Sequence, residues 1–244
     1  MRPNPTEPQG PSGVLLIDKA PEMTSHDVVA IARKALNTKK IGHCGTLDPM
    51  ATGLLMLVVG RATKIQDLLM SEHKEYEGTL TLGQVTSTQD KQGEVISESP
   101  VPEFTEEQIR AAFDAFTGDF EQLPPMVSAI KKDGVPLYKL ARKGQEIERA
   151  LRPVSVHHYA IGRIALPEVD FTVNCTKGFY VRTYAHDIGQ KLGCGAHLSA
   201  LRRTRSGKFT LERAIPVAAL KTTPREELLR SMVTLAEISL MRGA

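Results

Sequence analysis

The sequence predicts an α+β fold built on a mixed sheet. Segments with strand patterning and segments with helix patterning are interspersed along the chain, without a regular β-α-β alternation. No internal repeat is visible. The chain has 244 residues, of which 41% are hydrophobic and 24% are charged. These values suit one large soluble domain that buries a sizeable core.

Apolar patterning defines the expected elements. Short apolar runs and alternating segments indicate strands, and an apolar spacing of three and four residues indicates helices. Thr24 or Ser25 can cap the first helix, and Thr105 forms a capping box with Gln108 at another. In chain order we expect a strand at 13–20, a helix at 24–37, a strand at 54–60, a helix at 62–71, a strand at 75–84, a hairpin-like loop at 86–94, helices at 105–118 and 137–144, strands at 154–166 and 169–178, a helix at 180–193 that ends at Gly193, a strand at 201–211 and an amphipathic helix at 226–240.

The N-terminus and the cysteines indicate a cytoplasmic protein. Residues 1–12 are rich in proline and lead into no long apolar stretch, so we expect a disordered lead-in and no signal peptide. No run approaches the roughly 18 apolar residues of a membrane span. Cys44, Cys175 and Cys194 are far apart and lack zinc-site spacing, which fits a reducing compartment.

Two segments carry residues suited to chemistry. In the loop 42–53, glycines allow close backbone approach to another molecule, and Pro49 restricts the conformation of Asp48. A carboxylate placed there suits a nucleophile or a base, and the alternative is that Asp48 caps a turn. In the segment 175–193, Arg182 can keep a carboxylate ionised in a closed pocket, and the alternative is a surface arginine.

The small net charge of +3 conceals two basic segments. Residues 126–153 contain seven basic and three acidic residues, a balance of +4. Residues 177–208 contain seven basic residues and one acidic residue, a balance of +6. Either segment can be a solvated face, but two of them beside a candidate site favour RNA or DNA as the partner.

Several common catalytic motifs are missing from the sequence. It has no glycine-rich dinucleotide or nucleotide motif, no H-E-x-x-H motif and no G-x-S-x-G motif. We therefore expect a reaction that depends on side chains alone, with no cofactor and no metal.

Five blocks, in order, resemble motifs of the TruB family of pseudouridine synthases. Residues 42–64 look like the family's catalytic signature, and the ordered match over about 13–220 makes the resemblance specific. One departure is that Ala20 separates Lys19 from Pro21. The other blocks are 13–29, similar to the first motif, 74–95, similar to the tyrosine motif, 122–144, similar to the RNA-clasping insertion, and 175–209, similar to the last motif.

The resemblance implies a fold and a domain layout. The fold is the pseudouridine synthase fold, an α+β fold with a mixed, largely antiparallel central sheet flanked by helices and an RNA-clasping insertion. The expected parts are the lead-in at 1–12, a catalytic domain at 13–222 and a C-terminal amphipathic helix at 223–244. A small PUA-type domain, which many bacterial relatives carry beyond this point, is expected to be absent.

The resemblance also assigns roles to individual residues. Asp48 matches the catalytic aspartate, a nucleophile, with Arg182 as its pairing partner and Tyr76 placed to take the proton from C5 of the base. By residue type alone, Tyr76 can be a packing residue, Leu201 a core leucine and His43 a turn hydrogen-bonder. The expected substrate contacts are His43, Tyr76, Tyr180, Leu201 and Lys19. The expected RNA-backbone contacts in the basic segments are Lys131, Lys132, Arg142, Arg202 and Arg203.

The implied activity is the isomerisation of uridine 55 in the T loop of tRNA to pseudouridine. The base is flipped out of its stack, its bond from N1 to C1′ breaks, and C1′ bonds to C5. Asp48 attacks C1′ or C6, or removes a proton from C2′, and the sequence leaves these routes open. We expect a stand-alone monomer that binds the tRNA T arm and uses neither guide RNA nor membrane. The competing class is a non-catalytic RNA-binding or tRNA-folding protein, and a tRNA-folding role can accompany catalysis.

Overall fold

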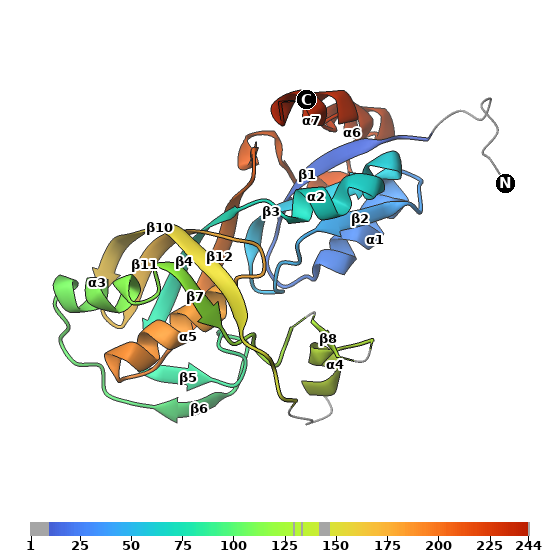
Figure 1. Cartoon of the computed structure of the whole chain (residues 1–244). Helices are drawn as coiled ribbons and strands as arrows, with labels where there is room; N and C mark the ends of the chain where they lie inside the picture. The colour runs from blue at the N-terminus through green and yellow to red at the C-terminus, as the bar shows by residue number, and fades with distance from the viewer. Residues whose placement is uncertain (1–9, 129, 133, 142–146, 244) are drawn as a thin grey trace. The chain divides into compact units, whose positions relative to one another are not determined.

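A computed structural model describes residues 10–128, 130–132, 134–141 and 147–243, without the side chains at 131, 132, 136, 138 and 139. The chain forms two compact units (Figure 1). The first unit combines Met1–Met70 with Lys208–Ala244, and the second is Ser71–Gly207.

The first unit is built on a mixed sheet. Strands β1 and β2 each pair antiparallel with β3, and β14 pairs in parallel with β1. The apolar runs predicted as strands at 13–20 and 54–60 are buried in β1 and β3. Helices α1 and α2 both contact β2. The bounds are β1 Gly13–Lys19, α1 Ser25–Ala35, β2 Ile41–Cys44, β3 Thr52–Val59, α2 Gln66–Met70 and β14 Ile215–Pro216.

The predicted helix at 62–71 is only partly α-helical. A 3-10 helix, η1 (Gly60–Ile65), precedes α2. Gly60 has a φ of +60°, and a Cβ on it would lie 2.1 Å from the carbonyl oxygen of Pro11. Glycine is therefore required at this position both for its backbone conformation and for the space around it.

The C-terminal segment differs from the prediction of a single amphipathic helix. The structure has two short helices, α6 (Arg225–Ser231) and α7 (Leu235–Met241). They are separated because Val233 forms an antiparallel bridge with Val14 of β1, with two backbone hydrogen bonds of 2.8 Å. Apolar periodicity continues across this break, so the pattern of residues alone does not reveal it.

The sheet of the second unit is antiparallel, with strands in the order β12, β4, β11, β10 and β7. Strand β4 alternates between buried and more exposed residues, as its sequence predicts. The bounds are β4 Lys74–Leu82, β7 Gly118–Gln122, β10 Arg152–Ala165, β11 Glu168–Cys175 and β12 Ala196–Ser206.

Two helices accompany this sheet. Helix α3 (Glu106–Asp114) begins with the predicted capping box, and α5 (Val181–Leu192) ends at Gly193 in the left-handed conformation, also as predicted. Smaller elements complete the unit: β5 Gln84–Thr86 paired with β6 Val95–Glu98, β8 Lys131–Lys132 paired with β9 Val135–Pro136, and α4 Leu137–Ala141. The helix predicted at 137–144 corresponds to α4, and its predicted end at Gly144 lies outside the described residues.

An aromatic cluster joins α3 and α5 to the sheet. The Tyr184 ring of α5 lies 5.7 Å from the ring of Phe113 in α3 and 6.0 Å from that of Phe171 in β11, measured between centroids. Gly78 of β4 makes room for this cluster, because a Cβ there would lie 2.7 Å from the Phe171 ring. The predicted α+β fold with a mixed, largely antiparallel sheet is thus confirmed. None of the described helices is both long enough and apolar enough to cross a membrane.

Candidate active site

Asp48 lies in the loop between β2 and β3 of the first unit. Leu47 and Met50 on either side are buried while Asp48 is partly exposed, so an anchored loop presents a single carboxylate. The Asp48 carbonyl accepts a hydrogen bond from the Ala51 N–H at 3.0 Å, which closes a tight turn. Gly45 adopts a φ of +86°, a conformation that favours glycine.

Lys19 holds the backbone next to Asp48. Its side chain is 1% exposed, and Nζ donates hydrogen bonds to the carbonyl oxygens of Ala20, Met23 and Pro49 at 2.9, 2.7 and 3.2 Å. A buried ammonium group needs such partners, since an uncompensated charge away from water is costly. This anchoring role was not predicted, and the predicted contact between Lys19 and substrate stays a prediction.

His43 lies on β2 and is partly exposed. Its ring packs edge-on against the ring of His26 in α1, with 5.3 Å between centroids. Its carbonyl oxygen accepts a hydrogen bond from Gln66 Nε2 at 3.2 Å. Gly42 allows this approach, because a Cβ there would lie 2.7 Å from Gln66 Oε1. The residue before the Asp48 loop is therefore fixed by α1 and α2.

Tyr76, Leu201 and Arg203 share one face of the sheet in the second unit. Arg203 of β12 lies directly opposite Tyr76 of β4, and Leu201 lies opposite Gly78, two positions along. Cross-strand partners point to the same face, as do residues two apart on one strand. All three side chains are buried. The structure therefore brings two predicted substrate contacts together beside a buried guanidinium.

Arg182 lies in the first turn of α5 and is buried, which excludes the alternative of a surface arginine. Its Nη1 atom is 3.7 Å from Oδ2 of Asp90, and the two side chains are 4% and 5% exposed. Nη2 donates a hydrogen bond to the carbonyl oxygen of Val127, and the guanidinium carbon lies 5.8 Å from the centroid of the Tyr180 ring. Arg182 therefore has a carboxylate partner within its own unit, where water screens the attraction little.

Asp90, the buried carboxylate partner of Arg182, was not predicted from the sequence. Its carboxylate accepts hydrogen bonds from Thr88 Oγ1 at 2.6 Å and from the Gln92 N–H at 3.0 Å. Its carbonyl oxygen accepts a hydrogen bond from Thr86 Oγ1 at 2.6 Å. Hydrogen bonds between residues so close in the chain are typical of a turn, so the sequence around Asp90 indicates only a hairpin-like loop. The pairing with Arg182 depends on residues far apart in the chain, and no local pattern signals it.

The buried side chain of Gln122, at the end of β7, fixes the backbone of Tyr180. The Tyr180 N–H donates to Gln122 Oε1 at 2.8 Å, and Gln122 Nε2 donates to the Tyr180 carbonyl oxygen at 3.1 Å. Thr183 Oγ1 in the same turn donates to Gln89 Oε1 at 2.8 Å. The start of α5 is thereby held from both sides, and it leaves Tyr180 partly exposed, as a substrate contact requires.

Burial shifts two titratable groups farther along α5. It lowers the pKa of His186 and raises the pKa of the Asp187 carboxyl to about 6. Among the residues that the structure describes, no three His, Cys, Asp or Glu side chains gather as a metal ion would require.

The predicted RNA-backbone contacts have different surroundings. Arg202 is partly exposed, whereas the Arg203 side chain is only 1% exposed, which does not fit a contact with phosphate. The reason is strand alternation, because neighbours on β12 point to opposite faces. Lys131 and Lys132 form β8, but their side chains are not described, and Arg142 lies outside the described residues.

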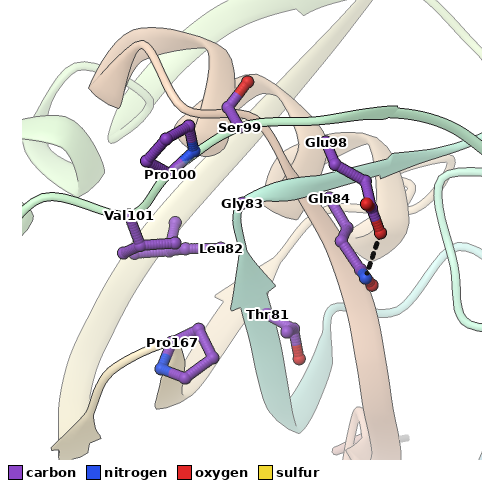
Figure 2. A pocket seen from close by; sticks show the side chains of 9 residues that line it. All are labelled: Thr81, Leu82, Gly83, Gln84, Glu98, Ser99, Pro100, Val101 and Pro167. Carbon is purple, nitrogen blue, oxygen red and sulfur yellow. Dashed lines mark hydrogen bonds between the residues drawn. The ribbon is translucent and has the colours of Figure 1, made fainter.

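An open pocket of about 490 Å³ lies at the far end of β4, also in the second unit (Figure 2). Glu98 at the end of β6, the residues 99–101 that follow it, and Pro167 complete the lining. Gln84 Nε2 donates a hydrogen bond to Glu98 Oε1 at 2.9 Å at this pocket. None of the site residues predicted from the sequence lines it.

Two family models match the chain and identify its class of enzyme. The model described as TruB family pseudouridylate synthase (N terminal domain) matches residues 33–181, so the chain is a pseudouridine synthase, an isomerase. The model described as tRNA pseudouridylate synthase B C-terminal domain matches residues 182–240. The chain therefore belongs to the TruB family.

Individual relatives agree with this assignment. A tRNA pseudouridine synthase B of Opitutus terrae is 58% identical over 221 residues, covering 91% of this chain and 92% of the relative. One of Geobacter sulfurreducens is 51% identical over 209 residues, covering 86% and 69%. Among solved structures, a Cbf5-Nop10-Gar1 complex contains a chain that matches with a TM-score of 0.71 and 32% identity over 94% of this chain. The present chain spans 62% of that solved chain.

Proposed function

We propose that this enzyme converts uridine 55 in the T loop of tRNA to pseudouridine, as a stand-alone and cofactor-free monomer of the cytoplasm. The observation that carries the proposal is the near full-length identity of 58% to a protein named tRNA pseudouridine synthase B. The geometry of the loop also supports the proposal, because buried neighbours anchor the loop while Asp48 is partly exposed.

Asp48 supplies the carboxylate for the reaction. In one route it attacks C1′, the bond from C1′ to N1 breaks, and the uracil turns over. C5 then bonds to C1′ and displaces the carboxylate, the proton on C5 leaves, and N1 ends with a proton. Attack on C6 and removal of a proton from C2′ are alternative routes for the same carboxylate.

One carboxylate suffices because the leaving base is retained. Glycosidases use two carboxylates, since they must protonate a departing group and bring in water or a nucleophile. Here no water is consumed and no electrons are exchanged. Side chains alone can therefore carry the reaction.

The family resemblance assigns the supporting groups in this proposal. Arg182, fixed by Asp90 and the Val127 carbonyl, provides a positive charge that keeps the carboxylate of Asp48 ionised. Tyr76 lies against the base and accepts the proton from C5. Tyr180, Leu201, His43 and Lys19 complete the proposed contacts with the nucleotide.

RNA binding must offset the cost of flipping the uridine, a few kcal/mol. We assign this to phosphate contacts from the basic segments, with Arg202 as the described candidate and Lys131, Lys132 and Arg142 as further ones. The family resemblance implies that the T loop is recognised mainly by its shape, with a few base contacts. The tRNA-folding role that the family resemblance also suggests stays a prediction.

The proposal is tested with T-arm RNA that carries tritium at C5 of its uridines. Wild-type enzyme should release tritium into water as C5 loses its proton, and Asp48→Asn should release none. Absence of release by the wild type under conditions in which it binds the RNA would disprove the proposed activity. Release by Asp48→Asn at the wild-type rate would remove Asp48 from the mechanism.

A further inference from the structure

We propose that Ser25 is a positioning residue that sets the geometry of the Asp48 loop. The inference rests on the proposed function, because it concerns the carboxylate to which that function assigns the reaction. Ser25 is the first residue of α1, and its side chain is fully buried at 0% exposure. It belongs to the same compact unit as Asp48.

The Ser25 hydroxyl binds both polar backbone groups of Leu47, the residue that precedes Asp48. The Leu47 N–H donates to Ser25 Oγ at 2.9 Å, and Oγ donates to the Leu47 carbonyl oxygen at 3.3 Å. Leu47 is itself buried. One hydroxyl therefore satisfies the backbone donor and acceptor of a residue that is screened from water, and leaving such groups unpaired is costly.

Ser25 is available for this contact because another residue caps α1. Both Thr24 and Ser25 are suitable caps by residue type. The structure uses Thr24, whose Oγ1 accepts a hydrogen bond from the Asp27 N–H at 3.1 Å while Asp27 Oδ2 accepts one from the Thr24 N–H at 2.8 Å. This reciprocal capping box fixes the start of the helix. The Ser25 hydroxyl is thereby held on a rigid element and directed at the loop.

The residue that follows Asp48 is held separately. The Pro49 carbonyl oxygen accepts hydrogen bonds from the Glu22 N–H at 2.8 Å and from Lys19 Nζ at 3.2 Å. Asp48 thus lies between two fixed peptide groups, one bound by Ser25 and the other by Lys19 and Glu22. Removing the Ser25 hydroxyl releases the first of them and leaves the second in place.

Loss of the Ser25 hydroxyl should reduce the reaction rate strongly and leave the affinity for RNA nearly unchanged. A displacement of about 1 Å at a reacting group can cost about 100-fold in rate, so we expect Ser25→Ala to be slower by about 10- to 100-fold. The basic segments, to which we assign the contacts with the RNA backbone, do not include this loop. The dissociation constant for RNA should therefore change by less than about 2-fold, well below one tenfold step in affinity.

The test measures single-turnover release of tritium from C5-labelled T-arm RNA, the RNA dissociation constant and the thermal midpoint. Ser25→Ala removes the hydroxyl, and Ser25→Thr keeps it on the same carbon. Ser206→Ala is the matched control, because Ser206 is also buried and its hydroxyl has no hydrogen-bond partner among the described residues. Ser206→Ala should react at the wild-type rate.

At a temperature below its thermal midpoint, Ser25→Ala should bind RNA normally and release tritium slowly. Ser25→Thr should recover most of the rate. The proposal is overturned if Ser25→Ala reacts as fast as Ser206→Ala, or if Ser25→Thr is as slow as Ser25→Ala. Should Ser25→Ala not fold, Ser25→Cys replaces it. A thiol has a similar shape but is a weak donor and acceptor, so this variant must be slow.

Failure of the proposed function gives a different result. If the wild type releases no tritium, or if Asp48→Asn is as fast as the wild type, the assignment of the reaction to Asp48 is wrong and the inference falls with it. If both of these controls behave as proposed and Ser25→Ala stays fast, only the role of Ser25 is refuted.

Discussion

Breaking the buried ion pair of Arg182 and Asp90 should destabilise the folded state by an amount that follows from the burial of the pair. The substitution Asp90→Asn keeps the shape of the side chain and removes its charge. The amide oxygen can still accept the hydrogen bonds from Thr88 and Gln92. Arg182 then keeps its charge in a site where both side chains are 5% exposed or less, without the carboxylate 3.7 Å away.

Removal of one partner of a buried ion pair typically costs about 3 to 5 kcal/mol. Because the turn around Asp90 keeps its hydrogen bonds, we expect a loss near the lower limit, about 3 kcal/mol. For a chain of this size such a loss lowers the thermal midpoint by about 6 to 12 °C. The rate of tritium release should also fall, since Arg182 is the group proposed to keep Asp48 ionised.

The measurement is urea unfolding followed by circular dichroism, with Glu106→Gln as the control. Glu106 forms an exposed ion pair with Arg110 at 2.6 Å, with side-chain exposures of 61% and 49%. Loss of a surface pair of this kind costs less than about 1 kcal/mol. If Asp90→Asn is destabilised no more than Glu106→Gln, the pair with Asp90 does not hold Arg182.

Two further predictions follow from burial. Burial raises the pKa of Asp187 from 3.8 to about 6, so its carboxylate destabilises the folded state increasingly as pH rises through that range. Asp187→Asn should therefore be more stable than the wild type at pH 8 and equal to it below about pH 4, and unfolding curves that show a constant difference at both pH values would contradict this. Arg202→Ala should lower the slope of log affinity for RNA against log salt by roughly 0.7 to 0.9, whereas Arg203→Ala should lower the thermal midpoint and leave the slope unchanged. Equal slopes in the two variants would show that burial does not separate the two arginines.

Local patterns in the sequence predicted most of the elements. The capping box of Thr105 and Gln108, the stop at Gly193 and the alternation along β4 all depend on residues close in the chain, and all appear in the structure. The break between α6 and α7 was missed because its cause is remote. It is set by the bridge between Val233 and Val14, two residues at opposite ends of the chain.

The candidate site was predicted in the same uneven way. The position of Asp48 on a loop before an apolar strand was recognisable from glycines and Pro49, whereas the short strand β2 at the start of that loop was not predicted. The partners that hold the loop and the guanidinium, Ser25 and Asp90, were not, because each contacts a residue distant in sequence. In the sequence, Ser25 is explained as a residue at the start of a helix and Asp90 as a residue of a turn. Neither explanation requires a functional role.

Mapping the modified position in tRNA tests most directly whether the enzyme isomerises uridine 55 through the Asp48 carboxylate. An unmodified tRNA transcript is incubated with the enzyme, treated with a carbodiimide that marks pseudouridine, and read by primer extension. Wild-type enzyme should produce one new stop, which marks uridine 55, and Asp48→Asn should produce none. A stop at another uridine, or the same stop with Asp48→Asn, would contradict this prediction.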